Sequence, residues 1–191
     1  QKTIFNSKIL VVGAGGLGSP EIDLLVRAGV GFLGVIEDDK VDYSNLHRQT
    51  LYDYNDVGKY KSDVIKKKIK LINDKIKLKI FKERATDKNL SKILPKFDII
   101  VDWTDNFPTK FLLNKYSLKY RKKLVIGAIS KFDGHFFSFD FSQKKITCLN
   151  CFYQGMPSDE ILNCEAEGIL GPTANVIGAL QANEVLKLIL G

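Results

Sequence analysis

The sequence predicts an α/β fold built on a doubly wound, mostly parallel sheet, and three observations support this. Short apolar segments alternate with helical segments along most of the 191 residues. The first apolar segment runs into a glycine turn that opens a helix, as in a parallel β-α-β unit. Near the end, residues 134–141 alternate apolar and polar side chains, which predicts an antiparallel C-terminal edge, and residues 174–190 predict a long C-terminal helix.

The first β-α-β unit is the best defined. Lys8–Val12 is a short apolar run that stops at glycines, which is typical of a buried parallel strand. Residues 17–28 follow as a helix, because Pro20 is tolerated in a first turn and Gly29 suits a helix end. A second strand, Phe32–Ile36, stops at three acidic residues.

A polar segment, residues 40–58, comes next, and a stretch of this size without periodicity is usually functional in a compact domain. Beyond it the alternation resumes. We expect a helix at 59–74, a strand at 78–81, a short helix near Leu90, a strand at 97–101, a helix at 107–120 and a strand at 124–129.

Composition indicates one domain over residues 1–191, since 45% of the residues are hydrophobic. Net charge is +7, but the basic residues are mainly lysines spread along the chain, without a stacking platform of aromatics and arginines. We therefore expect no nucleic-acid partner, and no membrane partner either, because no run of about 18 apolar residues occurs. Three cysteines are too few for a secreted disulfide framework, so a cytoplasmic protein is expected. The absence of an initiator Met, with strand-like sequence beginning almost at once at Lys8, suggests that an N-terminal segment of the full protein is missing.

The glycine turn is the first candidate binding feature. Gly13, Gly15, Gly16 and Gly18 fit the pattern G-x-G-x-x-G between a strand and a helix, where backbone N–H groups and the helix dipole favour phosphates. Glu37 lies 19 residues after Gly18 at the end of the next strand, where a carboxylate accepts from ribose hydroxyls. These features fit NAD as well as ATP, and a glycine turn needed only for packing is the structural alternative.

Residues further along favour ATP. A triphosphate carries roughly four negative charges and needs cations and a metal, whereas a pyrophosphate manages with backbone donors. Arg48 is one of few arginines and can clamp phosphate in a bidentate way, and Lys61 stands at a helix start. Asp102 and Asp105 follow a strand at the sheet edge where such folds bind ligands, and Mg²⁺ prefers carboxylates with phosphate oxygens.

Four motifs together resemble the ThiF/MoeB (HesA/MoeB/ThiF) family of ATP-dependent sulfur-carrier adenylyltransferases, which are related to ubiquitin-activating enzymes. They are Gly-Ala-Gly-Gly-Leu-Gly-Ser from Gly13, Ser-Asn-Leu-His-Arg-Gln from Ser44, Val57-Gly58 with Lys61, and Thr104-Asp105-Asn106. The resemblance implies a Rossmann-like fold, ATP and Mg²⁺ as cofactors, and adenylation of the C-terminus of a ubiquitin-like carrier that ends in Gly-Gly. It also implies a homodimer. It leaves thiamine-type and molybdopterin-type carriers equally open.

The resemblance also implies roles for individual residues. Catalysis would depend on Arg48, Lys61 and Asp105, with Asp105 holding Mg²⁺. The nucleotide would be bound by Gly13, Gly15 and Gly16 at the phosphates, Glu37 at the ribose, Asp39 as a polar neighbour, and Asn45, Arg48, Gln49 and Lys61 at the triphosphate. Asp102 is left between a metal role and a structural one.

The three cysteines are candidates for zinc binding and for sulfur transfer. Cys148 and Cys151 have the spacing of half a tetrahedral zinc site, which in the family a second pair near the C-terminus completes. A C-terminal segment of the full protein is expected to be missing as well, since no second cysteine pair follows Cys148 and Cys151 before Gly191. Zinc is therefore expected in the full-length protein, with two ordinary loop cysteines as the alternative. Cys164 is a candidate for covalent sulfur transfer, although neighbouring Glu165 and Glu167 would raise the pKa of its thiol, and a plain cysteine is the alternative.

One departure and three competing functions stay open. The family carries an arginine ahead of the first strand that reaches the partner's ATP site, and no arginine precedes Lys8. This chain by itself is therefore expected to bind ATP poorly. The alternatives are an NAD(P)-dependent oxidoreductase domain, a tRNA-modifying enzyme that activates a carboxylate, and a non-catalytic scaffold. His47 and His135 are expected to be a site neighbour and a structural residue, and the phenylalanines at 132, 136, 137, 139 and 141 to be mostly core.

Overall fold

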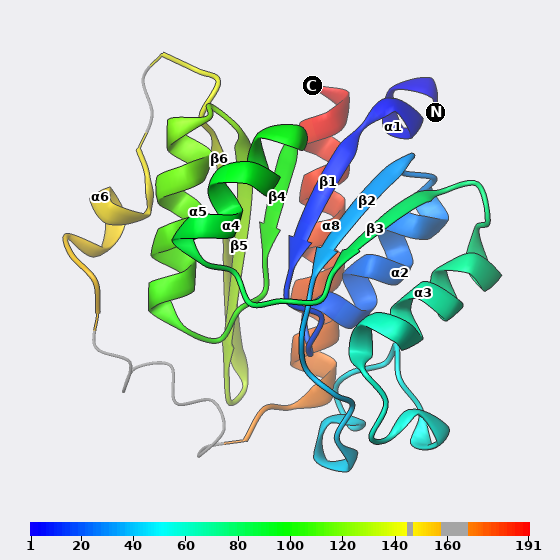
Figure 1. Cartoon of the computed structure of the whole chain (residues 1–191). Coiled ribbons are helices and arrows are strands. Elements are labelled where there is room, and N and C mark those ends of the chain that lie inside the picture. Colours follow the sequence, from blue (N-terminus) through cyan, green and yellow to red (C-terminus); the bar gives the residue numbers. More distant parts are fainter. Residues whose placement is uncertain (145–146, 158–167) are drawn as a thin grey trace.

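The computed structural model describes residues 1–144, 147–157 and 168–191. A six-stranded sheet in the order β3-β2-β1-β4-β5-β6 forms its centre (Figure 1). The first five strands are parallel and β6 is antiparallel to β5. The strands are β1 Lys8–Val12, β2 Phe32–Ile36, β3 Lys77–Phe81, β4 Ile99–Asp102, β5 Lys123–Ser130 and β6 Asp133–Asp140.

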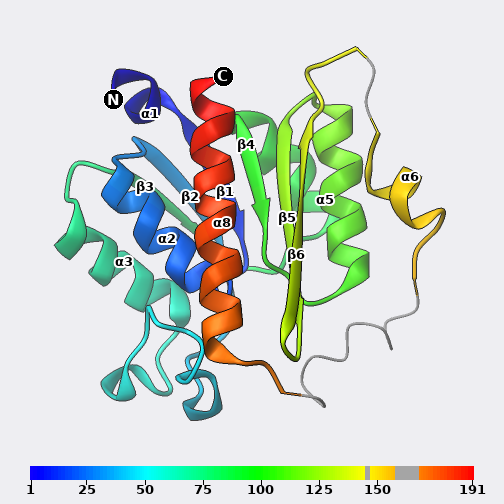
Figure 2. The same cartoon turned by 180° about the vertical axis from the view of Figure 1, so that it is seen from behind.

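Helices cover both faces of the sheet. One face carries α2 (Gly18–Ala28), α3 (Lys61–Ile72) and the long α8 (Gly171–Leu190), which Figure 2 shows crossing the sheet. The other face carries α4 (Asp87–Ile93), α5 (Phe107–Lys119) and the short α6 (Leu149–Tyr153), which packs on α5. The short N-terminal helix α1 (Lys2–Asn6) contacts α8. Single 3₁₀ turns lie at Tyr43–Asn45, Tyr54–Asp56 and Leu94–Lys96.

The two helical layers enclose two separate cores because side chains of a strand point alternately to opposite faces. Ile9 and Val11 of β1 belong to the core beneath α2 and α8, whereas Leu10 and Val12 belong to the core beneath α4 and α5. All four are at most 2% exposed. A strand buried on both faces needs apolar residues at every position, which explains why the run 9–12 has no polar alternation.

The predicted fold class is confirmed, including the antiparallel edge and the long last helix. Boundaries shift by a few residues; the last helix begins at Gly171 rather than at 174, because Pro172 fits its first turn. The helices α1 and α6 had not been predicted. The phenylalanine stripe is mostly core, as expected: Phe139 and Phe141 are buried and Phe136 and Phe137 are half-buried, whereas Phe132 at the β5–β6 turn is 76% exposed.

The strand order places a ligand crevice between β1 and β4. From β1 the chain crosses to β2 on one side, and β4 leads to β5 on the other, so the loops after these strands diverge. Val12 is in register with both Ile36 and Asp102. The residues that follow these three strand ends therefore meet at one edge of the sheet. None of the helices in the described part of the chain combines the length and apolar character that a membrane crossing requires.

Candidate nucleotide site

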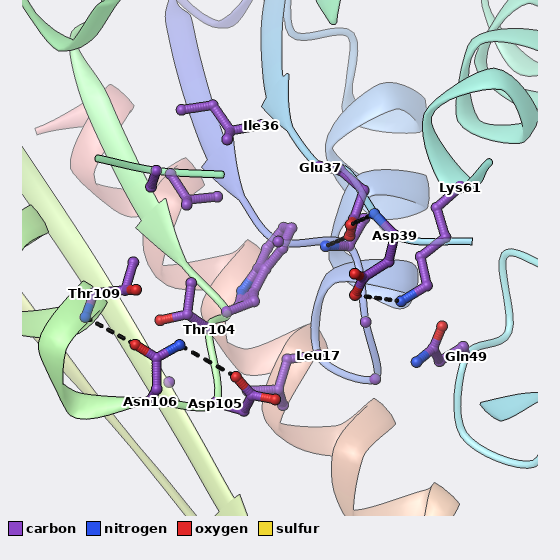
Figure 3. A pocket seen from close by; sticks show the side chains of 18 of the residues that line it. Leu17, Ile36, Glu37, Asp39, Gln49, Lys61, Thr104, Asp105, Asn106 and Thr109 are labelled. Atoms are coloured by element: carbon purple, nitrogen blue, oxygen red, sulfur yellow. Dashed lines mark hydrogen bonds and ion pairs between the residues drawn. The ribbon is translucent and has the colours of Figure 1, made fainter. Parts of the chain in front are cut away.

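A pocket of about 660 Å³ opens at the carboxyl ends of the parallel strands. Ten residues that the sequence singled out line it together: Gly13, Gly15, Gly16, Glu37, Asp39, Asn45, Arg48, Gln49, Lys61 and Asp105. Figure 3 shows that Glu37, Asp39 and Lys61 lie on one side of this pocket and Asp105 and Asn106 on the other. The residues come from five separate stretches of chain, so the fold unites them in one place.

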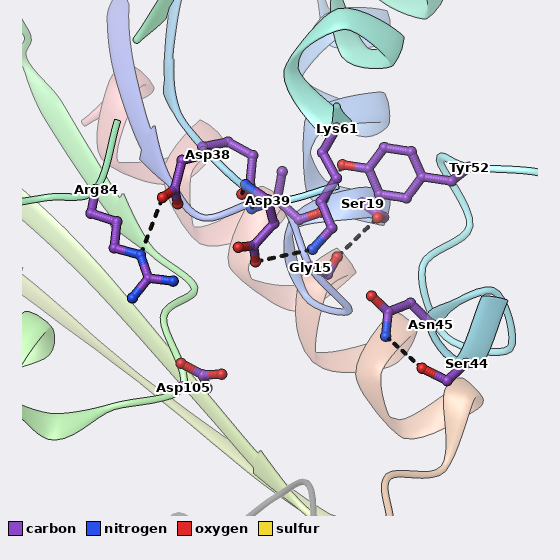
Figure 4. Close-up of polar contacts among 12 residues, drawn as sticks. Gly15, Ser19, Asp38, Asp39, Ser44, Asn45, Tyr52, Lys61, Arg84 and Asp105 are labelled. Carbon is purple, nitrogen blue, oxygen red and sulfur yellow. Dashed lines mark hydrogen bonds and ion pairs between the residues drawn. The ribbon is translucent and has the colours of Figure 1, made fainter. Parts of the chain in front are cut away.

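The glycine loop forms the floor between β1 and α2. Gly13 has a φ of 89°, a conformation that glycine adopts without strain, and its N–H donates to the Ile36 carbonyl at 2.9 Å. A Cβ at Gly13 would also lie 3.2 Å from the Trp103 carbonyl oxygen. Ser19 Oγ donates to the Gly15 carbonyl at 2.9 Å (Figure 4). The loop thus leads directly into the first turn of α2, whose free N–H groups favour an anion.

Glu37 ties this loop to the end of β2. Its side chain is buried, with Oε2 accepting from the Ala14 N–H and Oε1 from the Asp39 N–H, both at 2.8 Å. Burial raises the pKa of Glu37, and the charge of Lys61 and the two backbone hydrogen bonds partly oppose this rise. Each carboxylate oxygen keeps a further lone pair, so the group can hold both backbone segments and still accept from a hydroxyl.

Lys61 provides a buried cation next to the loop. It begins α3, is 5% exposed, and its Nζ lies 3.5 Å from Asp39 Oδ2 (Figures 3 and 4). The Lys61 N–H also donates to the Asp39 carbonyl at 2.9 Å. A contact of 3.5 Å at a half-open carboxylate leaves most of the hydrogen-bonding capacity of the ammonium available to a ligand.

Arg48 is a second cation and has no carboxylate partner among the described residues. It is half-buried, and its Nη1 donates to the Ser44 carbonyl at 3.3 Å. Its side-chain carbons approach Gly16, where a Cβ would lie 3.5 Å from Arg48 Cδ. Gln49, 3% exposed, lies beside Gly15, and its Oε1 has no hydrogen-bonding partner among the residues described. Among the described residues, a guanidinium without a carboxylate partner and an amide oxygen without a hydrogen bond lie next to the glycine loop, where they can bind a polar ligand.

The two carboxylates after β4 differ in availability. Asp102 is fully buried, 3.0 Å from Lys110 Nζ, and accepts from the Thr104 N–H and hydroxyl, so it is structural. Asp105 is exposed and accepts only a 3.3 Å bond from Asn106 Nδ2 among the contacts that the described residues make. Asn106 in turn caps α5 by accepting from the Thr109 N–H. Asp105 is therefore the carboxylate of this pair that is open to a metal.

The run Glu37, Asp38 and Asp39 brings three carboxylates within 4.8 Å of one another. Each already has a partner: Glu37 accepts backbone N–H groups, Asp38 pairs with Arg84 at 3.1 Å and Asp39 pairs with Lys61. Figure 4 shows the Arg84 and Lys61 pairs side by side. Two of the three carboxylates thus have a cationic partner, and backbone N–H groups hold the third.

Sequence reasoning missed four residues of the site. Tyr52 donates its hydroxyl to the Ala14 carbonyl at 2.9 Å, Lys110 donates to the Gly127 carbonyl at 2.7 Å, and Trp103 and Arg84 line the pocket. Arg84, like Arg48, is a rare arginine in a lysine-rich chain, so the same argument could have identified it. The other three act through contacts with distant backbone, which leave no pattern in the sequence.

Cys148 and Cys151 lie outside this pocket. Cys148 and Cys151 approach with their sulfurs 3.5 Å apart at the start of α6. Burial alone would raise the pKa of Cys148, but hydrogen bonds from Cys151 and Asn150 lower it. Cys164 lies outside the described residues. His47, predicted as a neighbour of the phosphates, contacts the carbonyls of Ser44 and Ile169.

These features define a nucleotide-binding protein with a doubly wound sheet whose pocket offers cations and a free carboxylate beside the glycine loop. The chain belongs to the ThiF family, whose family model matches residues 1–191. It is similar to a sulfur carrier protein adenylyltransferase of Thermus thermophilus, with 39% identity over 100% of this chain and 72% of that protein. It is also similar to a probable molybdopterin-synthase adenylyltransferase of Gracilaria tenuistipitata var. liui, with 38% identity over 100% of this chain and 53% of that protein.

Solved structures agree with this membership. A crystal structure of E. coli MccB with MccA-N7isoASN has a TM-score of 0.85 and 26% identity, covering 98% of this chain and 58% of that one. A crystal structure of E. coli MccB with ATP has a TM-score of 0.81 and 26% identity, covering 98% and 57%. The chain thus spans 53% to 72% of the length of these three proteins.

Proposed function

We propose that this protein uses ATP to adenylate the C-terminal carboxylate of a ubiquitin-like sulfur-carrier protein of the thiamine or molybdopterin type, releasing pyrophosphate. The observation that carries the proposal is the meeting of Arg48, Lys61 and Asp105 around the glycine loop. A dinucleotide would leave these three groups without a task. The names of the relatives, sulfur carrier and molybdopterin-synthase adenylyltransferases, support adenylation over the oxidoreductase alternative.

The chemistry requires positioning and charge neutralisation. The terminal carboxylate of the carrier attacks the α-phosphorus of ATP, a bond from carboxylate oxygen to phosphorus forms, and the bond to the leaving pyrophosphate oxygen breaks. A carboxylate is ionised at about pH 7, so no general base is needed. Arg48 and Lys61 stand where they would neutralise charge that spreads over the phosphates as the bond breaks.

The residues also fit a magnesium ion that accompanies the triphosphate. Asp105 is exposed, weakly engaged and on the pocket wall, and Mg²⁺ binds to one or two carboxylates together with phosphate oxygens. Bound there, the ion would neutralise phosphate charge. In this proposal Asp105 binds the metal, and Glu37 accepts from the ribose while it holds the glycine loop.

Zinc is a second proposed metal, held away from the pocket. Two thiolates on one tetrahedral zinc, with bonds of about 2.3 Å, lie roughly 3.8 Å apart, and the observed 3.5 Å is close to that. Cys148 and Cys151 would supply half of the ligands. Zinc analysis of the purified full-length protein, beside Cys148→Ser, tests this: loss of zinc in the variant is expected, and equal zinc in both would contradict it.

We further propose that residues 1–191 act as one ThiF-type domain of a cytoplasmic homodimer. Large apolar side chains on the outer face of α8, Val176 at 57% and Leu180 at 45% exposure, support a partner surface. Sedimentation equilibrium tests the dimer, and a monomer at micromolar concentration would count against it.

ATP–pyrophosphate exchange tests the main proposal. Labelled pyrophosphate should enter ATP only in the presence of a carrier that ends in Gly-Gly, and a carrier with its last glycine removed is the matched control. Titration with NADH should give no saturable binding. Saturable NADH binding, with no exchange for carriers of either type, would overturn the assignment.

A further inference from the structure

A buried carboxyl lies beneath the nucleotide pocket and takes no part in the proposed chemistry. Glu21 is in the first turn of α2 and is 0% exposed. Neither of its oxygens has a regular hydrogen bond to any described residue. Burial raises the pKa of Glu21 well above its ordinary value, and the indole of Trp103 is the group that opposes this rise. Burying a polar group without a regular hydrogen bond costs folding free energy.

Trp103 is the neighbour of this carboxyl. Its indole Nε1 is buried and likewise has no regular hydrogen bond among the residues described. Two polar groups without other partners therefore face one another, one on α2 and the other just beyond β4. An indole N–H can only donate, and a carboxyl group offers an oxygen that accepts.

The indole ring also packs directly against the glycine loop, at positions where a side chain would clash with it. A Cβ on Gly18 would lie 2.5 Å from Trp103 Cε3, and a Cβ on Gly13 would lie 3.2 Å from the Trp103 carbonyl oxygen. The Trp103 N–H donates to the Val12 carbonyl at 2.9 Å. Trp103 is thus wedged against both ends of the glycine loop, and Asp105 follows it by two residues.

We propose that Glu21 and Trp103 form a positioning pair, in which the buried carboxyl holds the indole beside Gly18 and so sets the loop of Asp105 against the glycine loop. This inference rests on the proposed function, because it assigns the pair to the nucleotide site of that reaction. Neither side chain contacts ATP in this proposal. Their role is to set the distance between the phosphate cradle and the carboxylate that would hold the metal.

Two substitutions of similar size separate positioning from simple packing. Glu21→Gln has the same shape and a carbonyl acceptor, whereas Glu21→Met keeps the volume and removes the acceptor. Glu21→Met removes a carboxyl that is costly to bury but leaves the indole N–H without its acceptor, so the two effects on stability oppose one another. Glu21→Met is therefore expected to unfold within a few degrees of the wild type. The Kd of MgATP should rise about tenfold in Glu21→Met and stay within about twofold in Glu21→Gln.

Equilibrium dialysis with MgATP and no carrier gives the Kd, and tryptophan emission gives a second readout. Trp103 is the only tryptophan of the 191 residues, so the emission reports this site alone. MgATP should shift the emission in the wild type and in Glu21→Gln, and the shift should shrink in Glu21→Met. Wild-type MgATP affinity in a folded Glu21→Met, or an equal loss in both variants, would overturn the pair. Failure of the proposed function would look different: the wild type would bind MgATP but show no exchange with any carrier.

Discussion

The ammonium of Lys61 lies 3.5 Å from the carboxylate of Asp39, with the lysine side chain 6% and the aspartate side chain 56% exposed. The two partners differ in solvent exposure, because the cation is buried while the anion is open to solvent. A half-exposed carboxylate holds a cation weakly. An entering phosphate can therefore compete for Lys61 without breaking a strong ion pair.

Replacing Lys61 is expected to impair chemistry more than folding. Lys61→Met keeps the buried stem and removes the charge, so exchange activity should fall by about 10²-fold or more, the order found for a lost electrostatic stabiliser. Carrier-dependent exchange kinetics measure this. Lys67→Met, an exposed lysine on the same helix, is the control and should change little. Equal activity of the two variants would contradict a role of Lys61 in the reaction.

Asp105→Ala should abolish ATP–pyrophosphate exchange and leave the fold intact. The side chain is exposed and makes one weak hydrogen bond, so its loss should change the free energy of unfolding by about 0.5 kcal/mol or less. Thermal unfolding and exchange are measured on the same sample, with exposed Asp133→Ala as the matched control. Near-normal exchange in a folded Asp105→Ala would refute its assignment as the metal ligand.

Asp102→Ala should show the opposite pattern, with stability as the primary loss. It would leave Lys110, 2% exposed, charged and without its partner, which typically costs about 3–5 kcal/mol. The melting temperature should fall by roughly 10 °C for a domain of this size. The double variant Asp102→Leu with Lys110→Met should recover most of that loss. A single variant as stable as the wild type would show that the buried pair contributes little.

Two glycines of the loop should respond differently to alanine. At Gly18 a Cβ would lie 2.5 Å from the Trp103 ring, so Gly18→Ala should destabilise the fold by about 1–3 kcal/mol through overpacking. At Gly16 the nearest atoms are 3.5 Å away, so Gly16→Ala should fold normally and instead weaken MgATP binding by crowding the phosphate cradle. Urea unfolding and nucleotide titration separate the two. The same profile for both variants would contradict this division.

The raised pKa of Glu37 predicts a pH dependence of nucleotide binding. Because the folded-state pKa lies above the ordinary value, Glu37 takes up a proton at a higher pH than an exposed glutamate does. The protonated group accepts less well from the Ala14 and Asp39 N–H groups and from a ribose. MgATP affinity should therefore weaken as the pH is lowered, beginning above the ordinary glutamate pKa of about 4.3.

Glu37→Gln is the control for that measurement. It should bind MgATP more weakly at neutral pH and show a flatter profile, since only the titration of ATP itself remains. The effect of Glu37 on folding stability has the opposite pH dependence from its effect on nucleotide binding. The folded state holds this proton more tightly than the unfolded state does, so the stabilising contribution is present at low pH and is lost as pH rises through the raised pKa. An unchanged pH profile in Glu37→Gln would show that another group governs the dependence.

Much of the fold followed from local patterns. The uninterrupted run Lys8–Val12 predicted a central strand because both of its faces are buried, and the alternation from residue 134 predicted the antiparallel edge. The short helix α6 was missed because five residues carry no helical periodicity. The sequence did not distinguish Phe132 from the rest of the phenylalanine stripe, because apolar character alone does not reveal that a residue lies at an exposed turn.

The sequence by itself determined the order of strands and helices, the glycine turn before α2 and the family, because these depend on periodicity, turn chemistry and contiguous motifs. Only the tertiary structure decided which of Asp102 and Asp105 is available and that Arg84 and Trp103 border the same pocket. It also brought Glu21 and Trp103 together, 82 residues apart in the chain. Burial and hydrogen-bonding partners arise from segments that meet through the crossing of the sheet, and no local pattern records them.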